Sequence, residues 1–250
     1  MKKNIKKTLL GILGKKIAGF LDYLRFPNMK NNPTSFTAQK YRKYFAQVLK
    51  SNYKIQNIVE TGSYKGDTTH YFRQLFNRPT YTVELDERHF GFVKTRFLFD
   101  NLVSVWFGHS KDFLKDLINI NIHKTKTLFY LDAHWGLNLP LKAELNLILN
   151  NWENFIIIID DFKVPEIPYY TFDRYKEKNE QGIYDFTKVL SLELIEDQLN
   201  NDIKIFFPSL IENPEPSNSS GWICLVKGEE HIYLKLLELN YLKEFQLHKG

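Results

Sequence analysis

The stretch that most constrains the fold of this chain is Ile58–Asp67, with the sequence Ile-Val-Glu-Thr-Gly-Ser-Tyr-Lys-Gly-Asp. An apolar run before Glu60 is typical of a buried strand, and Gly62 and Gly66 follow it before a segment with helical spacing. This order predicts a strand, a tight turn and a helix. Glycines in such a turn let the backbone approach a ligand, and the helix N-terminus offers free amides. The spacing Glu-x-Gly-x-x-x-Gly differs from the dinucleotide fingerprint, and alone it fits a plain glycine turn equally well.

From residue 55 onward, apolar strand-like runs alternate with amphipathic segments, which is the pattern of a parallel sheet covered by helices. Strands are predicted at Ile55–Glu60, Thr80–Glu84, Val103–Phe107, Thr127–Asp132, Phe155–Asp160, Ile203–Phe207 and Trp222–Val226. Helices are predicted at Thr69–Phe76, Glu87–Phe99, Lys111–Ile118, Leu141–Asn150 and Ile183–Leu199. A loop without a helix joins the last two strands, so we expect them to be antiparallel. The predicted fold class is α/β, with a doubly wound, mostly parallel sheet of seven strands, an antiparallel last strand and added N-terminal helices.

Polar residues stand at the carboxyl ends of the first five predicted strands. They are Glu60, Glu84, the turn Gly108-His109-Ser110, Asp132 and the pair Asp160-Asp161. One acid at a strand end is commonly only a turn residue, but five such ends along one edge are hard to attribute to turns alone. An acid after the second strand is placed to accept hydrogen bonds from ribose hydroxyls. Asp132, Asp160 and Asp161 would bring together hard oxygen ligands of the kind that Mg²⁺ prefers.

Taken in order, these motifs resemble the class I S-adenosylmethionine-dependent methyltransferases, and within them the cation-dependent O-methyltransferases typified by catechol O-methyltransferase. Ile58–Gly66 is similar to the family's methionine-binding loop, and Val83–Asp86 to its ribose-binding strand end. Gly108–Asp112 is similar to the adenine-side turn, and the strand ends Leu131–Trp135 and Ile159–Asp161 to the two metal-binding ends. The resemblance implies a Rossmann-like fold, S-adenosylmethionine as cofactor and Mg²⁺ at Asp132, Asp160 and Asp161. It implies that the cofactor-binding residues are Glu60, Gly62, Ser63, Gly66, Asp67, Thr68, Glu84, His109, Ser110 and Asp132.

The sequence departs from this family at the general base. In the catechol enzymes the metal-binding Asp is followed by His-Trp-Lys, whereas here Ala133 intervenes and Gly136 stands after Trp135. His134 becomes the leading candidate for the base, because an imidazole titrates near neutral pH, although it could instead only orient a ligand. Lys142 and His109 are lesser candidates. In the expected mechanism, Mg²⁺ held by residues that include Asp132 orients and acidifies an acceptor hydroxyl, and His134 takes the proton.

A long insertion after the fifth strand, residues 162–184, is expected to form a lid over the acceptor. Its many aromatic rings suit a small sugar or phenolic hydroxyl compound, although the rings could equally pack the loop onto the domain. Two other classes remain open. One is a nucleic-acid amino-methyltransferase, although Asp132-Ala-His-Trp135 lacks the prolines of that motif. The other is a relative that binds S-adenosylmethionine or metal without methylating.

The N-terminal arm accounts for the net positive charge of the chain, which is +5. Residues 1–30 hold eight Lys and Arg and one Asp, out of 34 basic and 29 acidic residues in the chain. The remaining 26 basic and 28 acidic residues nearly balance, so no nucleic-acid partner is expected. Leu9, Leu13, Ile17, Phe20 and Leu24 share one helical face. This basic amphipathic helix either packs over the site or at a homo-oligomer interface, or makes peripheral membrane contact through residues 1–26.

The expected organisation is an N-terminal region, residues 1–50, followed by a methyltransferase domain, residues 51–250. The first region contains the arm, a linker at Pro27–Ser35 and a helix at Thr37–Leu49. Cys224 is the only cysteine, so no internal disulfide can form, and a cytoplasmic location is expected.

Overall fold

The computed structural model describes residues 2–25, 36, 39–134, 139–178, 184–209, 219–228 and 230–247. Within the helices and strands, the side chains of residues 2–13, 176–178 and 184–187 are left undescribed. The predicted linker at Pro27–Ser35 lies outside the described residues, as does the start of the predicted helix at Ile183.

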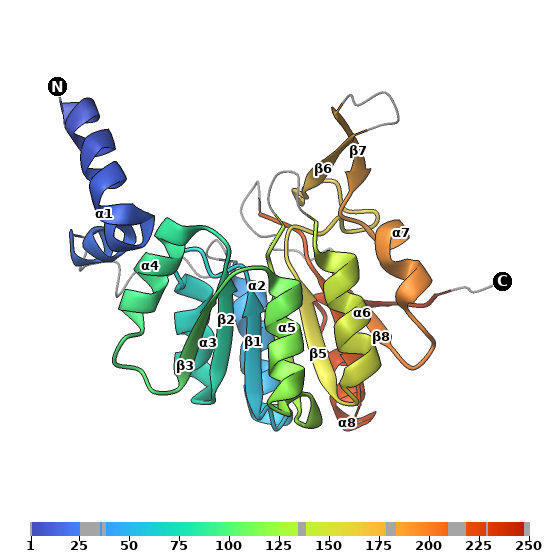
Figure 1. Ribbon diagram of the computed structural model, residues 1–250. Coiled ribbons are helices and arrows are strands. Elements are labelled where there is room, and N and C mark those ends of the chain that lie inside the picture. Colours follow the sequence, from blue (N-terminus) through green and yellow to red (C-terminus); the bar gives the residue numbers. More distant parts are fainter. Residues whose placement is uncertain are drawn as a thin grey trace.

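The core is an eight-stranded sheet in the order β10-β8-β9-β5-β4-β1-β2-β3 (Figure 1). The strands are β1 (Asn57–Thr61), β2 (Thr80–Glu84), β3 (Val103–Phe107), β4 (Thr127–Leu131), β5 (Phe155–Ile159), β8 (Lys204–Pro208), β9 (Ile223–Lys227) and β10 (Leu242–Phe245). The first five are parallel, and β9 is antiparallel to both β5 and β8. The seven predicted strands and the antiparallel last pair are confirmed. The eighth strand, β10, was not predicted because it is a four-residue edge strand that pairs with β8 alone.

Helices cover both faces of the sheet, as expected for a doubly wound fold. One face carries α2 (Lys40–Asn52), α3 (Asp67–Phe76), α4 (Glu87–Arg96) and α8 (Glu230–Leu237). The other carries α5 (Ser110–Asn119), α6 (Leu141–Asn151) and the short α7 (Leu192–Ile195), with one-turn 3₁₀ helices at Ile122–Lys124 and Glu196–Gln198. Successive residues of the central strands point to opposite faces, so that Ile156 and Ile158 pack towards α2, and Ile157 and Ile159 towards α6. Because both faces are covered, β5 is apolar at every position.

The predicted helix at Ile183–Leu199 is wrong in its first half. Tyr184–Val189 forms strand β7, which pairs antiparallel with β6 (Arg174–Lys178) in a separate two-stranded sheet. Aromatic, β-branched and polar residues alternate along Tyr184–Val189, a period of two that favours a strand over a helix. The insertion therefore extends to Leu190 and stands above the carboxyl edge of the main sheet (Figure 1).

The N-terminal helix α1 (Lys2–Arg25) packs against α4, with a kink at Gly14. Two glycines allow the close approach, since a Cβ on Gly19 would overlap the carbonyl oxygen of Arg88, and one on Gly91 would overlap that of Lys16. Arg88 also forms an ion pair with Asp22. These contacts hold part of the arm against α4, and packing of the arm over the site stays a prediction. Membrane contact and oligomer formation stay predictions, and none of the described helices is long and apolar enough to cross a membrane.

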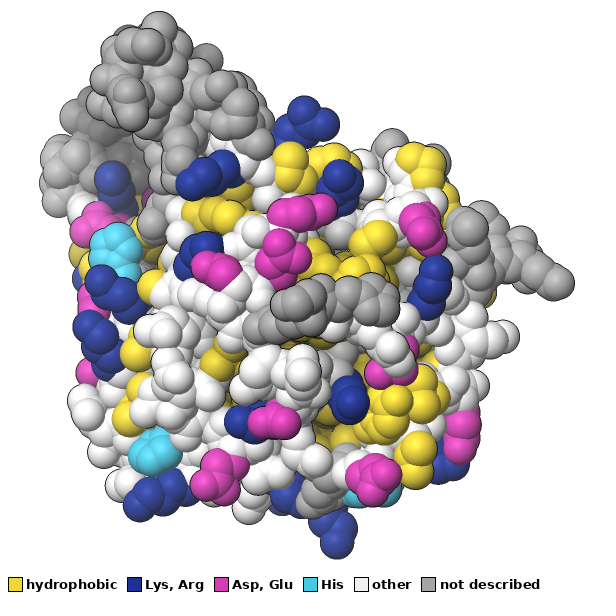
Figure 2. Space-filling view, turned by 90° about the vertical axis from the view of Figure 1, so that its right-hand side faces the viewer, with side chains coloured by type: hydrophobic (Ala, Val, Ile, Leu, Met, Phe, Trp, Pro, Cys, Tyr) yellow, Lys and Arg dark blue, Asp and Glu magenta, His cyan; other side chains and the backbone are white. Residues whose placement is uncertain are grey.

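Acidic and basic side chains are interspersed over the described residues of the face shown in Figure 2. No broad patch of a single charge stands out among them there. This pattern agrees with the near balance of charge outside the N-terminal arm, and the expected absence of a nucleic-acid partner stays a prediction.

Candidate active site

The carboxyl ends of three central strands meet in register at one edge of the sheet. Thr61 of β1 pairs with Leu131 of β4, which pairs in turn with Ile159 of β5. The ladder continues by one residue, because the Asp132 N–H donates to the Thr61 carbonyl at 2.9 Å and the Asp160 N–H to the Leu131 carbonyl at 3.1 Å. The acidic ends of β4 and β5 are therefore direct neighbours, as the sequence predicts.

The turn between β1 and α3 requires glycine at both predicted positions. Gly62 has a φ of 85°, and a Cβ there would overlap the carbonyl oxygen of Asp132. Gly66 has a φ of 77° and caps α3, where a Cβ would lie 2.7 Å from the Phe97 ring and 2.8 Å from a Val93 methyl carbon. Both glycines thus combine positive φ with close approach. Gly62 lets the turn pack directly against the end of β4, and Gly66 lets it pack against α4.

Glu60 and Ser63 are held inside this turn by hydroxyl groups. Glu60 accepts hydrogen bonds from Thr69 and, at 2.8 Å, from Thr82. The Ser63 hydroxyl lies 2.5 Å from that of Thr82 and 3.0 Å from the Val83 carbonyl oxygen. Burial raises the pKa of Glu60 to about 7, against the lowering effect of the Thr69 and Thr82 hydrogen bonds. The buried Glu60 therefore links β1 to the start of α3 and to β2.

Glu84, at the end of β2, ties this turn to the neighbouring strand. Its two carboxylate oxygens accept backbone N–H groups, from Tyr64 at 2.7 Å and from Asp86 at 2.8 Å. Burial raises the pKa of Glu84, and these two hydrogen bonds oppose the rise. A carboxylate offers about four lone-pair sites, so each oxygen keeps capacity for another donor.

The predicted residues of the first turn of α3 differ in their surroundings. Asp67 forms an ion pair with Arg96 at 2.5 Å, and Arg96 also donates to the Lys65 carbonyl at 2.7 Å. Thr68 is partly buried beside it. Asp67 thus links α3 to α4, and the structure supplies a structural reason for its presence.

The adenine-side turn lies at the start of α5. His109 is exposed and precedes the helix, whereas Ser110 is its first residue and is buried. Near Ser110 lies Glu144 of α6, which is 1% exposed and has one oxygen, Oε1, without a hydrogen bond among the described residues. Burial raises the pKa of Glu144 to about 7, while the nearby hydroxyls of Ser110 and Thr61 act in the opposite direction.

Asp132, His134 and Asp161 form the one group of potential metal ligands found in the described part of the chain. Each offers one ligand atom, and these atoms lie within 4.8 Å of one another. His134 Nε2 lies 3.7 Å from Asp132 Oδ1 and 3.9 Å from Asp161 Oδ2. Asp161 has a φ of 50°, a conformation that is costly for a residue with a side chain and that clusters at functional sites.

Burial and mutual repulsion decide the protonation of this cluster. About a third of the Asp132 side chain and of the Asp161 side chain is exposed, and the rest is covered by the protein. Burial and the charge of Asp160 raise the pKa of Asp161 to about 7, and burial with the charges of Asp160 and Asp161 raises that of Asp132 well above its usual range. Burial lowers the pKa of His134 to about 4, so its imidazole is neutral at pH 7. A bound cation would relieve the repulsion between the carboxylates.

Asp160, which the sequence suggests as a metal ligand, is instead enclosed by hydrogen-bond donors. Arg42 of α2 donates to Oδ1 at 2.6 Å, as do the Ser220 hydroxyl at 3.0 Å and the Asp161 N–H at 2.8 Å. The Tyr130 hydroxyl donates to Oδ2. Burial would raise the pKa of Asp160, but the charge of Arg42, together with the hydrogen bonds from Tyr130, Asp161 and Arg42, outweighs burial and holds that pKa below its usual value. Asp160 therefore acts as the partner of a fully buried guanidinium.

The insertion after β5 closes over the cluster through Tyr175. This ring is 3% exposed and packs edge-on to the His134 ring, with 6.4 Å between centroids. The Asp173 N–H donates to the Asp161 carbonyl at 2.9 Å, which fixes the start of β6 beside the cluster. Phe162 and Tyr170 are buried in the core, so these two rings pack the loop onto the domain and are not free to contact an acceptor.

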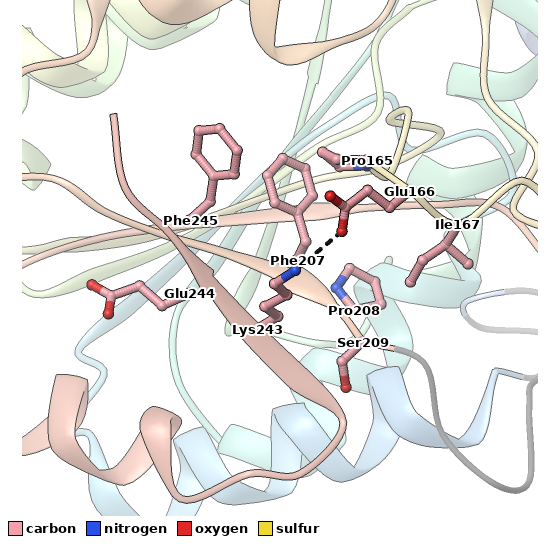
Figure 3. Close-up of a pocket in the computed structure, with 9 residues that line it drawn as sticks. All are labelled: Pro165, Glu166, Ile167, Phe207, Pro208, Ser209, Lys243, Glu244 and Phe245. Atoms are coloured by element: carbon pink, nitrogen blue, oxygen red, sulfur yellow. Dashed lines mark hydrogen bonds and ion pairs between the residues drawn. The ribbon is translucent and has the colours of Figure 1, made fainter. Parts of the chain in front are cut away.

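A pocket of about 340 Å³ lies elsewhere along the sheet, beside β8 and β10 (Figure 3). It is lined by Pro165, Glu166, Ile167, Phe207, Pro208, Ser209, Lys243, Glu244 and Phe245. Lys243 and Glu166 form an exposed ion pair across it at 3.1 Å. None of its lining residues belongs to the metal-ligand cluster or to the glycine turn, so we do not assign it to the candidate site.

Several solved structures of methyltransferases share this architecture. An O-methyltransferase from Bacillus cereus in complex with S-adenosylhomocysteine matches with a TM-score of 0.51 and 17% identity, over 90% of this chain and 97% of that one. The O-methyltransferase TomG from Streptomyces achromogenes, involved in tomaymycin synthesis and in complex with S-adenosylmethionine, matches with a TM-score of 0.52 and 13% identity, over 84% and 90%. The methyltransferase PaMTH1 of Podospora anserina, bound to S-adenosylhomocysteine, matches with a TM-score of 0.51 and 12% identity, over 84% of this chain and 88% of that one.

The chain has the fold of class I S-adenosylmethionine-dependent O-methyltransferases. No protein-family model and no curated protein sequence matches it. At identities this low, the likeness in structure establishes the methyltransferase fold alone.

Within this methyltransferase fold, the predicted site residues gather at the carboxyl edge, but their roles stay predictions. Two further residues were missed: Arg42 and Glu144. Arg42 lies in a helix 118 positions before its partner Asp160, so no local pattern could connect them. The heptad-like apolar spacing of Leu141, Leu145 and Ile148 places Glu144 on the buried face of α6, and this is the signal that could have identified it.

The three candidate general bases differ in their position relative to the carboxylates. Lys142 is exposed on α6 and forms an ion pair with Asp197 at 3.0 Å. His109 is exposed at the start of α5. His134 alone lies among the carboxylates, and its Nε2 is buried without a hydrogen-bond partner among the described residues.

Proposed function

We propose that the protein is an S-adenosylmethionine-dependent O-methyltransferase that acts on a hydroxyl of a small molecule of sugar or phenolic type, with a divalent cation at its acceptor site. The observation that carries the proposal is the juxtaposition of Gly62 with Asp132. The glycine turn that would hold the cofactor is packed against the strand end that would hold the cation, in a fold whose solved examples bind S-adenosylmethionine or S-adenosylhomocysteine.

The residues present fit this cofactor by their chemistry. Gly62 and Gly66 leave the two ends of the turn without side chains, and the buried Glu60 precedes the turn as an acid that a cationic amino-acid head group would favour. Glu84 retains lone pairs for two ribose hydroxyls after its bonds to the Tyr64 and Asp86 amides. We assign Ser110 to the adenine side. When bound, S-adenosylmethionine supplies an activated methyl group, and the protein supplies position and electrostatics.

The residues of the cation site fit the second half of the reaction. Asp132 and Asp161 would hold a divalent cation, which lowers the pKa of a bound hydroxyl and orients it. Mg²⁺ is the cation expected from the resemblance in sequence. Tyr175 and the start of β6 shield the same place from solvent. A small acceptor that enters between this lid and the glycine turn would be held for in-line attack on the methyl group.

The direct test is calorimetric titration of S-adenosylmethionine and S-adenosylhomocysteine into the purified full-length protein. We expect saturable one-site binding, and at least tenfold weaker binding by the Glu84→Gln variant, because the NH₂ group of its amide cannot accept the hydrogen bond that a carboxylate oxygen of Glu84 accepts from a backbone N–H or would accept from a ribose hydroxyl. Glu238→Gln is the matched control, since Glu238 is paired with Lys235 on the surface of α8 and its loop. Failure of the wild-type protein to bind either ligand would overturn the proposal.

A second arm separates an enzyme from a relative that only binds the cofactor. The protein is incubated with S-adenosylmethionine, a divalent cation and a panel of sugar and phenolic hydroxyl compounds, and release of S-adenosylhomocysteine is measured. Turnover that depends on one acceptor class is expected. Tight cofactor binding without turnover on any member of the panel would contradict the proposed acceptor and favour the non-methylating alternative.

A further inference from the structure

One buried atom of the candidate site has no hydrogen-bond partner in the part of the chain that the structure describes. His134 is 2% exposed, and its Nε2 has no hydrogen bond to any described residue. Leaving a buried ring nitrogen unsatisfied costs free energy, so such an atom calls for an explanation. Its nearest charged neighbours, Asp132 Oδ1 at 3.7 Å and Asp161 Oδ2 at 3.9 Å, are too far away for hydrogen bonds.

These separations match those between ligand atoms that share one ion. Nitrogen and oxygen atoms bound to a metal at about 2.0–2.2 Å stand roughly 3–4 Å from each other in tetrahedral or octahedral arrangements. Two oxygen atoms and one nitrogen atom thus lie within 4.8 Å of one another around one place. Two carboxylates held this close together also favour a cation between them.

The alternative all-oxygen ligand set is disfavoured by the packing around Asp160. Three donors reach its Oδ1 and one reaches its Oδ2, and one of the donors is the guanidinium of Arg42. Recruiting Asp160 to a cation would place that cation beside a buried positive charge. It would also compete with the ion pair that holds α2 against the sheet.

We propose that Asp132, His134 and Asp161 form a mixed nitrogen and oxygen site that selects a first-row transition-metal dication, such as Mn²⁺, over Mg²⁺. Imidazole nitrogen is a ligand that transition metals accept readily, whereas Mg²⁺ prefers oxygen ligands only. Three protein ligands leave positions open for water or an acceptor oxygen. In this arrangement the Nε2 lone pair is used by the cation, so His134 positions the cation and does not take the acceptor proton. The inference concerns cation binding alone, and it can hold or fail independently of methyl transfer.

The test uses the full-length protein freed of metal by a chelator, in the absence of S-adenosylmethionine. Titration calorimetry with MnCl₂ and MgCl₂ should show one site with at least tenfold tighter binding of Mn²⁺. In the His134→Gln variant, Mn²⁺ affinity should fall at least tenfold, while the weaker Mg²⁺ affinity should change less than threefold. His123→Gln is the matched control, because His123 lies outside the cluster with its Nδ1 3.1 Å from the Ile118 carbonyl.

Pulsed electron paramagnetic resonance of the Mn²⁺-loaded protein adds a readout that does not need a variant to fold. Coordinated imidazole should produce nitrogen modulation in the spin echo of the wild-type protein and of His123→Gln, and this modulation should be absent from His134→Gln. A wild-type spectrum without nitrogen modulation would overturn the proposal and favour an all-oxygen site. Equal affinities for Mn²⁺ and Mg²⁺, unchanged in His134→Gln, would do the same.

Discussion

The buried carboxyl of Glu144 should make the stability of this protein depend on pH in a predictable way. Its pKa is raised from 4.5 in the unfolded chain to about 7 in the folded protein. Between these two values the folded state keeps a proton that the unfolded state has lost, so folding takes up a proton. This group therefore lowers the free energy of unfolding as the pH rises from about 5 to about 7, and the loss is complete above the folded-state pKa.

The size of the effect follows from the shift. A rise from 4.5 to about 7, at about 1.4 kcal/mol for each pKa unit, corresponds to roughly 3 kcal/mol of lost stability between pH 5 and pH 8. Glu144→Gln keeps the shape of the side chain and cannot ionise. The stability of this variant relative to wild type should therefore increase by roughly 3 kcal/mol from pH 5 to pH 8. Glu60 has a similarly raised pKa, but it is present in both proteins and its effect cancels in the difference.

The assay is urea unfolding of both proteins at pH 5, 6, 7 and 8, followed by circular dichroism. With a slope of roughly 2–3 kcal/mol per molar urea, the midpoint of Glu144→Gln relative to wild type should move up by about 1 M across this range. Glu153→Gln, at an exposed position just after the same helix, should follow the wild type at every pH. A midpoint difference between Glu144→Gln and wild type that stays constant from pH 5 to pH 8 would show that Glu144 is charged in the folded protein throughout, and the reasoning would fail.

Two further predictions concern packing. Arg42→Met should lower the free energy of unfolding by about 3–5 kcal/mol, because it leaves the buried Asp160 carboxylate without its partner. Adding Asp160→Asn should recover most of that loss, as measured by urea unfolding. Equal destabilisation in the single and double variants would contradict this reasoning. Gly91→Val should detach α1 from α4, because its side chain would occupy the place of the Lys16 carbonyl. Limited proteolysis within residues 14–25 should then be at least tenfold faster, and an unchanged cleavage rate would show that the crossing does not depend on glycine.

The parts of the fold that the sequence predicts well are those specified by neighbouring residues. Phe155–Ile159 is apolar at every position because helices cover both of its faces, and this is visible in five consecutive letters. The turn at Gly62 and Gly66 is equally local. Leu242–Phe245 was missed because an edge strand of four residues is specified mainly by its partner β8. Tyr184–Val189 was misassigned because a two-residue period over six positions is easily absorbed into a longer helical pattern.

The candidate site shows the same division. Acidic strand ends can be found by reading along the chain, because each follows its own apolar run. Which of two adjacent acids faces the enclosed space cannot be found in this way. Arg42 and Tyr130 donate hydrogen bonds to Asp160, and these partners come from a helix and a strand far away in sequence. The burial of His134, which sets its neutral state, likewise depends on Tyr175 of the later insertion.

The network around Asp160 also has a consequence for the order of events during folding. It joins α2, β4, the end of β5 and Ser220, which precedes the last central strand, β9. Contacts that span so much of the chain form late, since closing long loops costs entropy before the contacts are gained. The place where Asp132, His134 and Asp161 meet is thus completed only when nearly the whole chain is in position. Metal ions added at the start of refolding should leave the folding rate unchanged, and their uptake should report the arrival of the native state.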